Sequence, residues 1–245
     1  MSRAPHAMPH LKTMSEVDAV RRQVREWRAE GRRIALVPTM GNLHDGHLSL
    51  VRLAREQARR VVVSVFVNPS QFGPGEDLDA YPRTPDQDRA ALESEGADLL
   101  FMPTPEAIYP FGVEAMTRVS VPGLSAVLCG ASRPGHFDGV TTVVCRLLNI
   151  VQPDIAVFGQ KDYQQLLIVQ RMVTDLHLPV RIQAAPIQRE ADGLAMSSRN
   201  RYLQRDDRAR APAIHAARRK TVRAIAQGRR DYATLEAEGA AELMA

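Results

Sequence analysis

The fold is decided by the stretch Ile34-Ala35-Leu36-Val37-Pro38-Thr39-Met40-Gly41-Asn42-Leu43-His44-Asp45-Gly46-His47. Four apolar residues come first, a glycine-bearing turn and two histidines follow, and the apolar periodicity of Leu48–Arg59 predicts a helix. A turn of this kind exposes the backbone N–H groups and the positive dipole end of the helix. We therefore expect an α/β unit with an anion-binding site at the turn.

The two histidines form an H-x-G-H element. His44 and His47 are three residues apart, so their imidazoles face the same way on a first helical turn. Neutral or protonated, they are able to donate hydrogen bonds to a polyphosphate, and Gly41 and Gly46 let the backbone come close to a ligand. An H-x-x-H pair on its own would more often simply begin a helix. The order of strand, glycine turn, histidines and helix favours a nucleotide site instead.

Composition limits the class of protein. The chain has 245 residues, 44% of them hydrophobic, and a net charge of +4 carried mostly by arginine. No apolar stretch approaches the ~20 residues of a membrane span, and Met1–His10 has no apolar secretion-signal region. Cys129 and Cys145 lack metal-ligand spacing, which favours a cytoplasmic location and leaves a disulfide between them open. In Arg205–Arg230, acidic residues and alanines interrupt the arginines, so we expect a solvated helix face and neither a nucleic-acid nor a membrane partner.

Strand and helix patterns alternate along most of the chain. Thr13 and Ser15 are expected to cap a first helix, Val17–Glu30. The predicted strands are Ile34–Val37, Val61–Val67, Asp98–Met102, Asp154–Phe158 and Val180–Ala184; the later helices are Leu48–Arg59, Asp86–Glu95, Val140–Val151 and Tyr163–Leu176. This order predicts a Rossmann-like, doubly wound parallel sheet, with ligands beyond the carboxyl ends of the strands. From Ser198 onward the pattern is helical and indicates a smaller C-terminal domain.

Two further segments carry polar side chains suited to phosphates. Lys161 and Asp162 follow a predicted strand, where a lysine supplies a compact charge for phosphate oxygens. Asp162 is suited to hold that lysine, to accept from a ribose hydroxyl, or only to cap the next helix. Met196-Ser197-Ser198-Arg199 offers two hydroxyls and a guanidinium that suit a triphosphate clamp, although a serine-capped helix start alone would also explain it.

Six segments together resemble one family. Pro38–Leu50, Ser64–Phe72, Tyr81–Thr84, Arg133–Val140, Phe158–Gln165 and Met196–Asn200 are similar in order and spacing to the pantothenate synthetase (pantoate–β-alanine ligase) family of the HIGH nucleotidyltransferase superfamily. The resemblance runs from about Ile34 to Leu203. It implies an ATP-dependent condensation of D-pantoate with β-alanine through a pantoyl adenylate, with release of AMP and pyrophosphate.

The resemblance also implies roles for single residues. His47, His44 and Lys161 are the expected catalytic residues. Gln71, Gln165, Asn68 and Met40 are the expected contacts to pantoate or β-alanine. The expected ATP contacts are Met40, Gly41, Asn42, Leu43, His44, Asp45, Gly46, His47, Gly159, Gln160, Lys161, Asp162, Gln188, Met196, Ser197, Ser198 and Arg199. Gln188 departs from the small apolar residue usual near the adenine.

Other features leave alternatives open. Mg²⁺ is expected on the ATP phosphates; Asp86 and Asp88 are candidates to help hold it, but capping or exposure explains them equally well. Arg133 and His136 serve either a ligand or the loop architecture, and Gln71–Asp77 is expected to be a mobile loop that helps exclude water.

The expected domain division is 1–185 for the nucleotide- and pantoate-binding domain and 186–245 for a lid domain that is incomplete relative to the family. A homodimer is implied by the resemblance. Two alternatives to an active ligase remain: a truncated, weakly active or inactive form that binds ATP or pantoate, and another HIGH-type nucleotidyltransferase.

Overall fold

The structure is a computed structural model that describes residues 11–244. It divides into two compact units, Met1–Pro186 and Ile187–Ala245. These are the N-terminal and the C-terminal unit.

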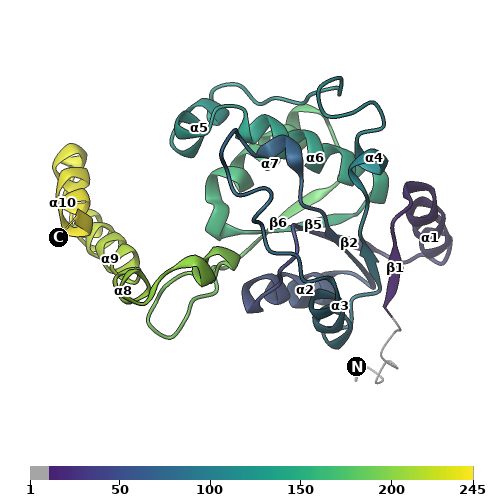
Figure 1. The fold of residues 1–245 in the computed structure, drawn as a ribbon, viewed down its shortest axis with the longest axis horizontal. Coiled ribbons are helices and arrows are strands. Elements are labelled where there is room, and N and C mark those ends of the chain that lie inside the picture. Colours follow the sequence, from purple (N-terminus) through teal and green to yellow (C-terminus); the bar gives the residue numbers. More distant parts are fainter. Residues whose placement is uncertain (1–10, 245) are drawn as a thin grey trace. The chain divides into compact units, whose positions relative to one another are not determined.

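The N-terminal unit is built on one sheet of six parallel strands (Figure 1). The strands are β1 (Lys12–Met14), β2 (Ile34–Thr39), β3 (Arg60–Val65), β4 (Leu99–Phe101), β5 (Ile155–Gly159) and β6 (Arg181–Ala185), in the spatial order β1-β4-β3-β2-β5-β6. From β2 the chain first adds β3 and β4 on one side and later β5 and β6 on the other. The strand order therefore reverses between β2 and β5, which is where ligands bind in open α/β sheets.

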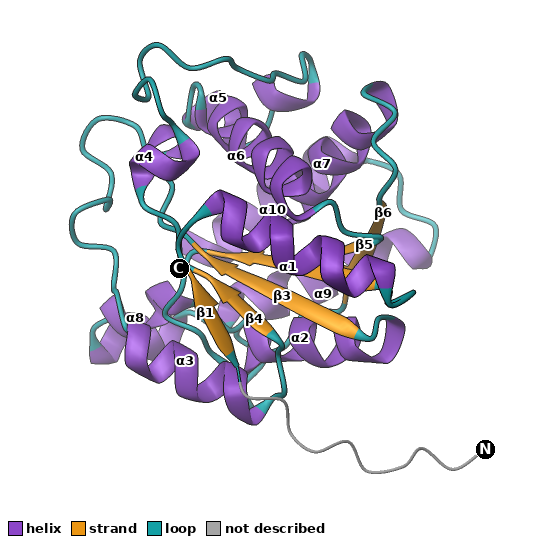
Figure 2. Ribbon diagram, turned by 90° about the vertical axis from the view of Figure 1, so that its right-hand side faces the viewer, coloured by secondary structure: helices purple, strands orange, loops and turns teal. Residues whose placement is uncertain are grey.

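Helices cover both faces of this sheet (Figure 2). The helices of this unit are α1 (Val17–Ala29), α2 (Asp45–Gln57), α3 (Pro85–Ser94), α4 (Pro105–Ile108), α5 (Cys129–Ser132), α6 (His136–Val151) and α7 (Tyr163–Asp175). One face of the sheet packs against α1, α6 and α7, and the other against α2 and α3. Alternate residues of each strand point to opposite faces, so Leu36 packs with α1, α6 and α7, whereas Ala35 and Val37 pack with α2 and α3. Both faces are buried, which explains the continuous rather than alternating apolar runs in the strands.

The predicted α/β fold is confirmed, with three local corrections. The helix expected from Leu48 begins at Asp45, because the His44 side chain caps it. The expected caps at Thr13 and Ser15 are wrong: α1 begins after Glu16, without a side-chain cap. Thr13 instead belongs to β1, a strand that was not predicted. It has only three residues, and its pairing with β4 is not encoded in any local pattern.

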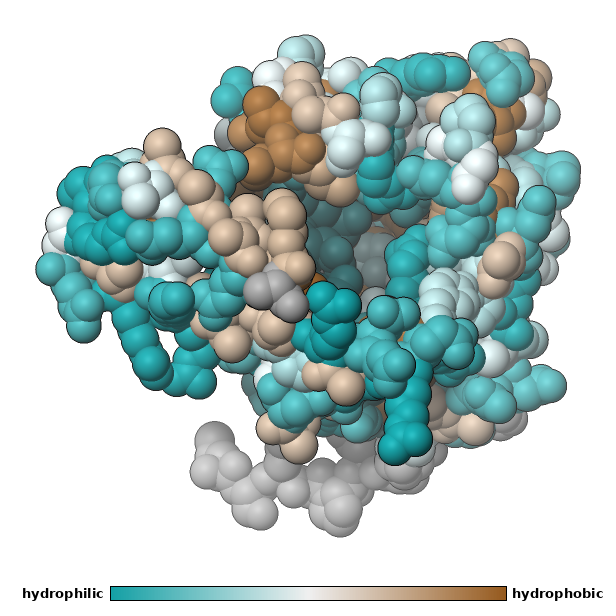
Figure 3. Space-filling model, turned by 60° about the vertical axis from the view of Figure 1, so that its left-hand side comes forward, coloured by the Kyte–Doolittle hydropathy of each residue, from teal (hydrophilic) through white to brown (hydrophobic). Residues whose placement is uncertain are grey.

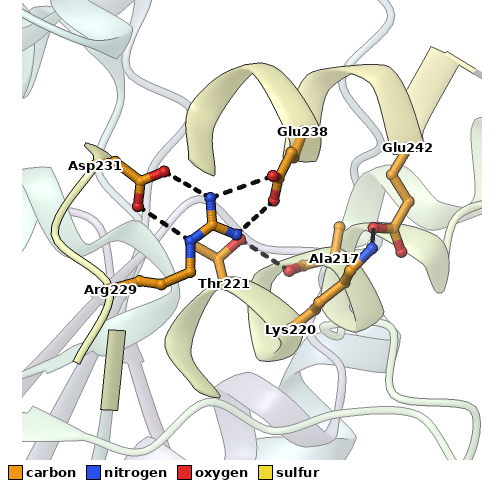
Figure 4. A network of polar contacts seen from close by, with 7 residues as sticks. All are labelled: Ala217, Lys220, Thr221, Arg229, Asp231, Glu238 and Glu242. Atoms are coloured by element: carbon orange, nitrogen blue, oxygen red, sulfur yellow. Dashed lines mark hydrogen bonds and ion pairs between the residues drawn. The ribbon is translucent and has the colours of Figure 1, made fainter. Parts of the chain in front are cut away.

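The C-terminal unit is helical after a short hairpin bridge between Arg189 and Ala195. It contains α8 (Arg205–Arg210), α9 (Ala213–Ala226) and α10 (Tyr232–Met244). Arg229, in the turn between α9 and α10, pairs with the carboxylates of Asp231 and Glu238 (Figure 4). These ion pairs hold the α9–α10 hairpin at its turn, and the exposed basic face expected for this region is present.

Polar residues dominate the face of the molecule drawn in Figure 3, where hydrophobic residues form only separate patches. Residues 11–244 contain no helix that combines the length and apolar character needed to cross a lipid bilayer. Cys129 and Cys145 are both free, so the disulfide left open by the sequence is not formed.

Candidate active site

The two histidines lie at the carboxyl end of β2, at the point where the strand order reverses. His44 is the residue that precedes α2, and His47 is in its first turn. Their ring centroids are 4.1 Å apart, so the structure brings the imidazoles into contact as the three-residue spacing predicts.

Each histidine uses its Nδ1 atom to hold the start of the helix. His44 Nδ1 accepts a hydrogen bond from the backbone N–H of Gly46 at 3.1 Å, and His47 Nδ1 accepts from the backbone N–H of His44 at 3.4 Å. A neutral imidazole that accepts at Nδ1 carries its proton on Nε2. Both rings are therefore fixed in the tautomer that donates from Nε2, and His47 borders a cavity.

The same surroundings keep His47 neutral. Burial, with the nearby His44 and the Lys161 ammonium as smaller causes, lowers the pKa of His47 from 6.5 to about 3. Near neutral pH His47 is thus an uncharged N–H donor rather than an imidazolium.

This shift predicts an acid sensitivity of folding. Between pH 6.5 and about 3 the unfolded chain binds a proton at His47 that the native protein excludes. Stability is therefore lost as the pH falls through this window, by about 2 kcal/mol at pH 5 from this residue. Urea unfolding at pH 7 and pH 5 measures the loss. The His47→Asn variant should lose correspondingly less, and equal losses in the two proteins would contradict the assignment.

A buried carboxylate holds the turn that precedes the histidines. Asp88, in the first turn of α3, is 2% exposed. Its oxygens accept from the backbone N–H groups of Asn42 (2.9 Å) and Leu43 (2.8 Å) and from the Thr84 hydroxyl (3.1 Å). Asn42 has a φ of 51°, a left-handed conformation that is uncommon outside glycine. Asp88 is thus occupied in fixing the loop backbone, whereas Asp86 is exposed.

Replacing Asp88 with asparagine is expected to lower the free energy of unfolding by about 2–3 kcal/mol. One carboxylate oxygen becomes an NH₂ group, which faces a backbone N–H without an acceptor. Urea denaturation gives the change. Asp86→Asn, in the same helical turn, is the matched control and should change stability by less than about 0.5 kcal/mol. Similar effects of the two substitutions would contradict the role of Asp88.

A cavity of about 150 Å³ lies between the carboxyl ends of β2 and β5 and the first turns of α6. Six of the predicted site residues line it: Met40, His47, Asn68, Gln71, Asp162 and Gln165. One wall is apolar and is formed mainly by Phe66, Val140, Val143, Val144, Leu147 and Phe158. Gly41 lines a second cavity of about 320 Å³ that shares Met40 and Phe66 with the first.

Lys161 and Asp162 lie in the short 3₁₀ helix Gln160–Asp162 that follows β5. The Lys161 ammonium is 3.2 Å from an Asp162 carboxylate oxygen, and both side chains are substantially exposed. Asp162 precedes α7 but makes no capping hydrogen bond. Of the three alternatives for Asp162, the structure therefore shows the pairing with lysine, and it does not show the cap.

Of the two alternatives for Arg133 and His136, the structure shows the contacts of the loop architecture. Arg133 forms a bidentate ion pair with Glu76: its Nε donates to Oε1 at 2.8 Å and its Nη2 donates to Oε2. The Arg133 Nη1 atom is 3.0 Å from His136 Nε2. The ion pair is the main cause that lowers the pKa of Glu76 to about 2. His136 Nδ1 lies 2.8 Å from the backbone oxygen of Gln71. The loop Gln71–Asp77 is thus fastened to the start of α6 at both ends.

Five of the predicted ATP contacts belong to the C-terminal unit. The Gln188 backbone oxygen accepts from the Met196 N–H at 3.0 Å, next to the hairpin bridge. The Ser197 hydroxyl accepts from the Arg199 N–H at 3.2 Å and caps a short 3₁₀ helix, Ser198–Tyr202. Ser197 thus has the capping role that the sequence offered, and the contact of Ser197, Ser198 and Arg199 with a triphosphate stays a prediction.

Two contributors to the site carry no sequence signal that we could use. Tyr109 follows α4 and reaches the buried Asn68 amide with its hydroxyl. Gly139, inside a segment already noted, lies against the backbone of Ser70 and Gln71, where a Cβ would meet the Ser70 oxygen at 2.2 Å. Contacts between segments 40 to 70 residues apart have no periodicity to reveal them.

The chain matches the family model described as pantoate-beta-alanine ligase over residues 12–245. A pantothenate synthetase of Shewanella sp. (strain ANA-3) is 56% identical over 236 residues, which are 95% of this chain and 83% of that protein. A pantothenate synthetase of Photobacterium profundum is 56% identical over 225 residues, 92% of this chain and 76% of that protein.

Solved structures are similar as well. The crystal structure of pantothenate synthetase from Thermus thermophilus superposes with a TM-score of 0.88 at 49% identity, covering 95% of this chain and 82% of that one. A pantoate-beta-alanine ligase from Francisella tularensis, complexed with beta-gamma ATP and beta-alanine, superposes with a TM-score of 0.79 at 37% identity, covering 84% and 78%.

Proposed function

The chain belongs to the pantoate-beta-alanine ligase family and is a ligase, and from this premise we propose that it condenses D-pantoate with β-alanine at the expense of ATP. The observation that carries the proposal is the position of the cavity. A pocket of amides and branched apolar side chains lies beside two imidazole N–H donors at the strand-order reversal.

The cavity suits the chemistry of pantoate. Pantoate has one carboxylate, two hydroxyl groups, and a carbon that bears two methyl groups. The α6 wall of Val140, Val143 and Leu147 offers an apolar surface for the methyl groups. Gln71 and Gln165 offer amides, which both donate and accept and so suit hydroxyl oxygens.

In the first step, a pantoate carboxylate oxygen attacks the α-phosphorus of ATP, the bond to the bridging oxygen breaks, and pyrophosphate leaves. Such a step needs alignment and charge stabilisation rather than a protein nucleophile. His47, and His44 beside it, would donate Nε2–H bonds to the phosphate oxygens as negative charge builds. Lys161 would supply a full positive charge from the β5 side.

In the second step, the β-alanine amine attacks the acyl carbon of pantoyl adenylate. The C–O bond to AMP breaks, the amide of pantothenate forms, and the amine gives up a proton. An acyl adenylate is readily hydrolysed, so exclusion of water matters. The fastened Gln71–Asp77 loop is suited to that task.

We assign the triphosphate clamp to the C-terminal unit. Ser197, Ser198 and Arg199 supply hydroxyls and a guanidinium, and Gln188 and Met196 would lie near the adenine. The fit is chemical: Arg199 is suited to two-point recognition of phosphate oxygens.

Mg²⁺ is treated as part of the substrate, Mg-ATP. Among the described residues, no group of three or more His, Cys, Asp or Glu side chains is arranged to hold a metal ion. Asp88 already accepts three hydrogen bonds. We propose that Mg²⁺ is carried by the ATP phosphates and keeps most of its waters. A homodimer and a cytoplasmic location stay predictions; sedimentation velocity tests the first.

The decisive experiment is AMP release from Mg-ATP in three mixtures: with D-pantoate and β-alanine together, with D-pantoate alone, and with β-alanine alone. Pantothenate is identified by mass. Pantothenate that requires both substrates supports the proposal. AMP formed without pantoate would favour another nucleotidyltransferase of the superfamily. Binding of ATP or pantoate without turnover would favour the weakly active or inactive form.

A further inference from the structure

The Asn68 side chain is the most completely bonded polar group near the cavity. It is 1% exposed and follows β3. Its Oδ1 accepts from the Tyr109 hydroxyl (2.6 Å), the Ser70 hydroxyl (2.9 Å) and the Ser70 N–H (3.3 Å). Its Nδ2 donates to Gln71 Oε1 (3.0 Å) and to the Gly139 oxygen (3.2 Å).

These bonds allow only one orientation of the Asn68 amide. A rotation by 180° would face the NH₂ group with the Tyr109 and Ser70 donors, and face the oxygen with the Gly139 carbonyl. Each buried mismatch costs about 1–3 kcal/mol. The amide is therefore held with its NH₂ group toward Gln71.

The orientation of Asn68 in turn fixes that of Gln71. Gln71 Oε1 is the acceptor for Asn68, so its NH₂ group is the part left for other contacts, and Nε2 lies 3.4 Å from Met40 Sδ. Gln71 and Met40 both line the 150 Å³ cavity. The cavity therefore offers an N–H donor at this point, and a ligand must present an oxygen with lone pairs there.

Tyr109 is itself firmly placed. It is 3% exposed, and the Arg146 guanidinium lies 4.9 Å from its ring centroid. Arg146 also donates to the Ile108 backbone oxygen at 2.7 Å. Burial raises the pKa of Tyr109, so its hydroxyl keeps its proton and remains available as a donor.

We propose that Tyr109 is a positioning residue for pantoate specificity: its hydroxyl, together with the Ser70 donors and the Gly139 carbonyl, holds the Asn68 amide in one orientation. Through Asn68 it makes Gln71 a hydrogen-bond donor to a substrate oxygen. The inference rests on the proposed function. It deepens that function because it gives the polarity of one substrate contact, and it assigns a task to a tyrosine outside the cavity lining.

The test is the Tyr109→Phe variant, which removes only the hydroxyl. We expect KM for D-pantoate to rise by about three- to tenfold, as the loss of one hydrogen bond allows. The values of kcat and of KM for ATP should stay within about twofold. Tyr232→Phe is the matched control, because Tyr232 is exposed on α10; it should change none of the three constants.

A second variant reverses the hydrogen bond itself. In Asn68→Asp the side chain only accepts, so Gln71 must turn its NH₂ group toward it and its oxygen toward the cavity. We expect KM for D-pantoate to rise by more than in Tyr109→Phe, again with KM for ATP little changed.

Each outcome has one meaning. If Tyr109→Phe leaves KM for D-pantoate unchanged, or raises KM for ATP in parallel, the role of Tyr109 is overturned. The proposed function still stands in that case, provided that the wild-type protein makes pantothenate. Wild-type protein that makes no pantothenate overturns the proposed function itself.

Discussion

The His47→Asn variant is expected to lose about 10²–10³-fold in kcat, because it lacks the Nε2–H donor that we assign to the phosphate transition state. Asparagine keeps an acceptor near the position of Nδ1, so the backbone N–H of His44 retains its partner and the start of α2 is preserved. Steady-state measurement of AMP release gives the loss in kcat.

His47→Gln provides the matched comparison. Its amide places an N–H group near the position of Nε2 but leaves the Nδ1 position empty. We expect it to retain more activity than asparagine and to start α2 less well. A more active asparagine variant would contradict the assignment of the catalytic role to the Nε2–H donor of His47, because asparagine replaces only the Nδ1 acceptor.

Gly139→Ala is expected to destabilise the protein by about 3 kcal/mol and to raise KM for D-pantoate at least about tenfold. A Cβ at residue 139 would lie 2.2 Å from the Ser70 carbonyl oxygen and 2.6 Å from the Gln71 Cα. Both are backbone atoms, so no side-chain rotation relieves the overlap. The segment that carries Asn68 and Gln71 must move away from α6. Urea denaturation and substrate kinetics measure the two effects.

Gly239→Ala is the matched control for Gly139→Ala. It shows the effect of helix propensity alone, without the steric overlap. Gly239 lies in α10, where an added Cβ would have Thr221 Oγ1 as its nearest neighbour, at 3.9 Å. Gly239→Ala should leave kinetics unchanged and raise stability by about 0.5–1 kcal/mol. An equal gain in Gly139→Ala would show that α6 does not need close approach to the loop.

Much of the fold could be predicted because its main signals are local. Val61–Val63 and Ile155–Val157 are continuous apolar runs, as strands buried on both faces require. The loops after Val37 and Phe158 could be placed together from sequence alone, since parallel strands end at the same edge of a sheet. The histidine pair, Gln71 and Gln165 could be assigned to one site because their motifs follow such strands and match those of one family.

The rest depends on contacts without a local pattern. β1 is only three residues long. Its Thr13 has the sequence pattern of a helix N-cap, and only the pairing of β1 with β4 shows that it belongs to a strand. For Asp88 the sequence leaves metal binding, helix capping and exposure open, because it does not tell whether a carboxylate faces water or two backbone N–H groups. No local pattern connects Tyr109 with its partner Asn68, which is 41 residues away.

The shared use of Nδ1 by the two histidines has a consequence for chelation. Two histidine side chains in contact can also coordinate zinc, which requires a free lone pair on each imidazole. Here both Nδ1 lone pairs accept backbone N–H groups. Coordination through Nε2 would move the ring protons onto Nδ1, against those same N–H groups. Zinc or nickel could therefore coordinate both imidazoles only if the first turn of α2 unwound. The site is thus a poor chelator of such metals, and its Nε2–H groups are suited to bind anions.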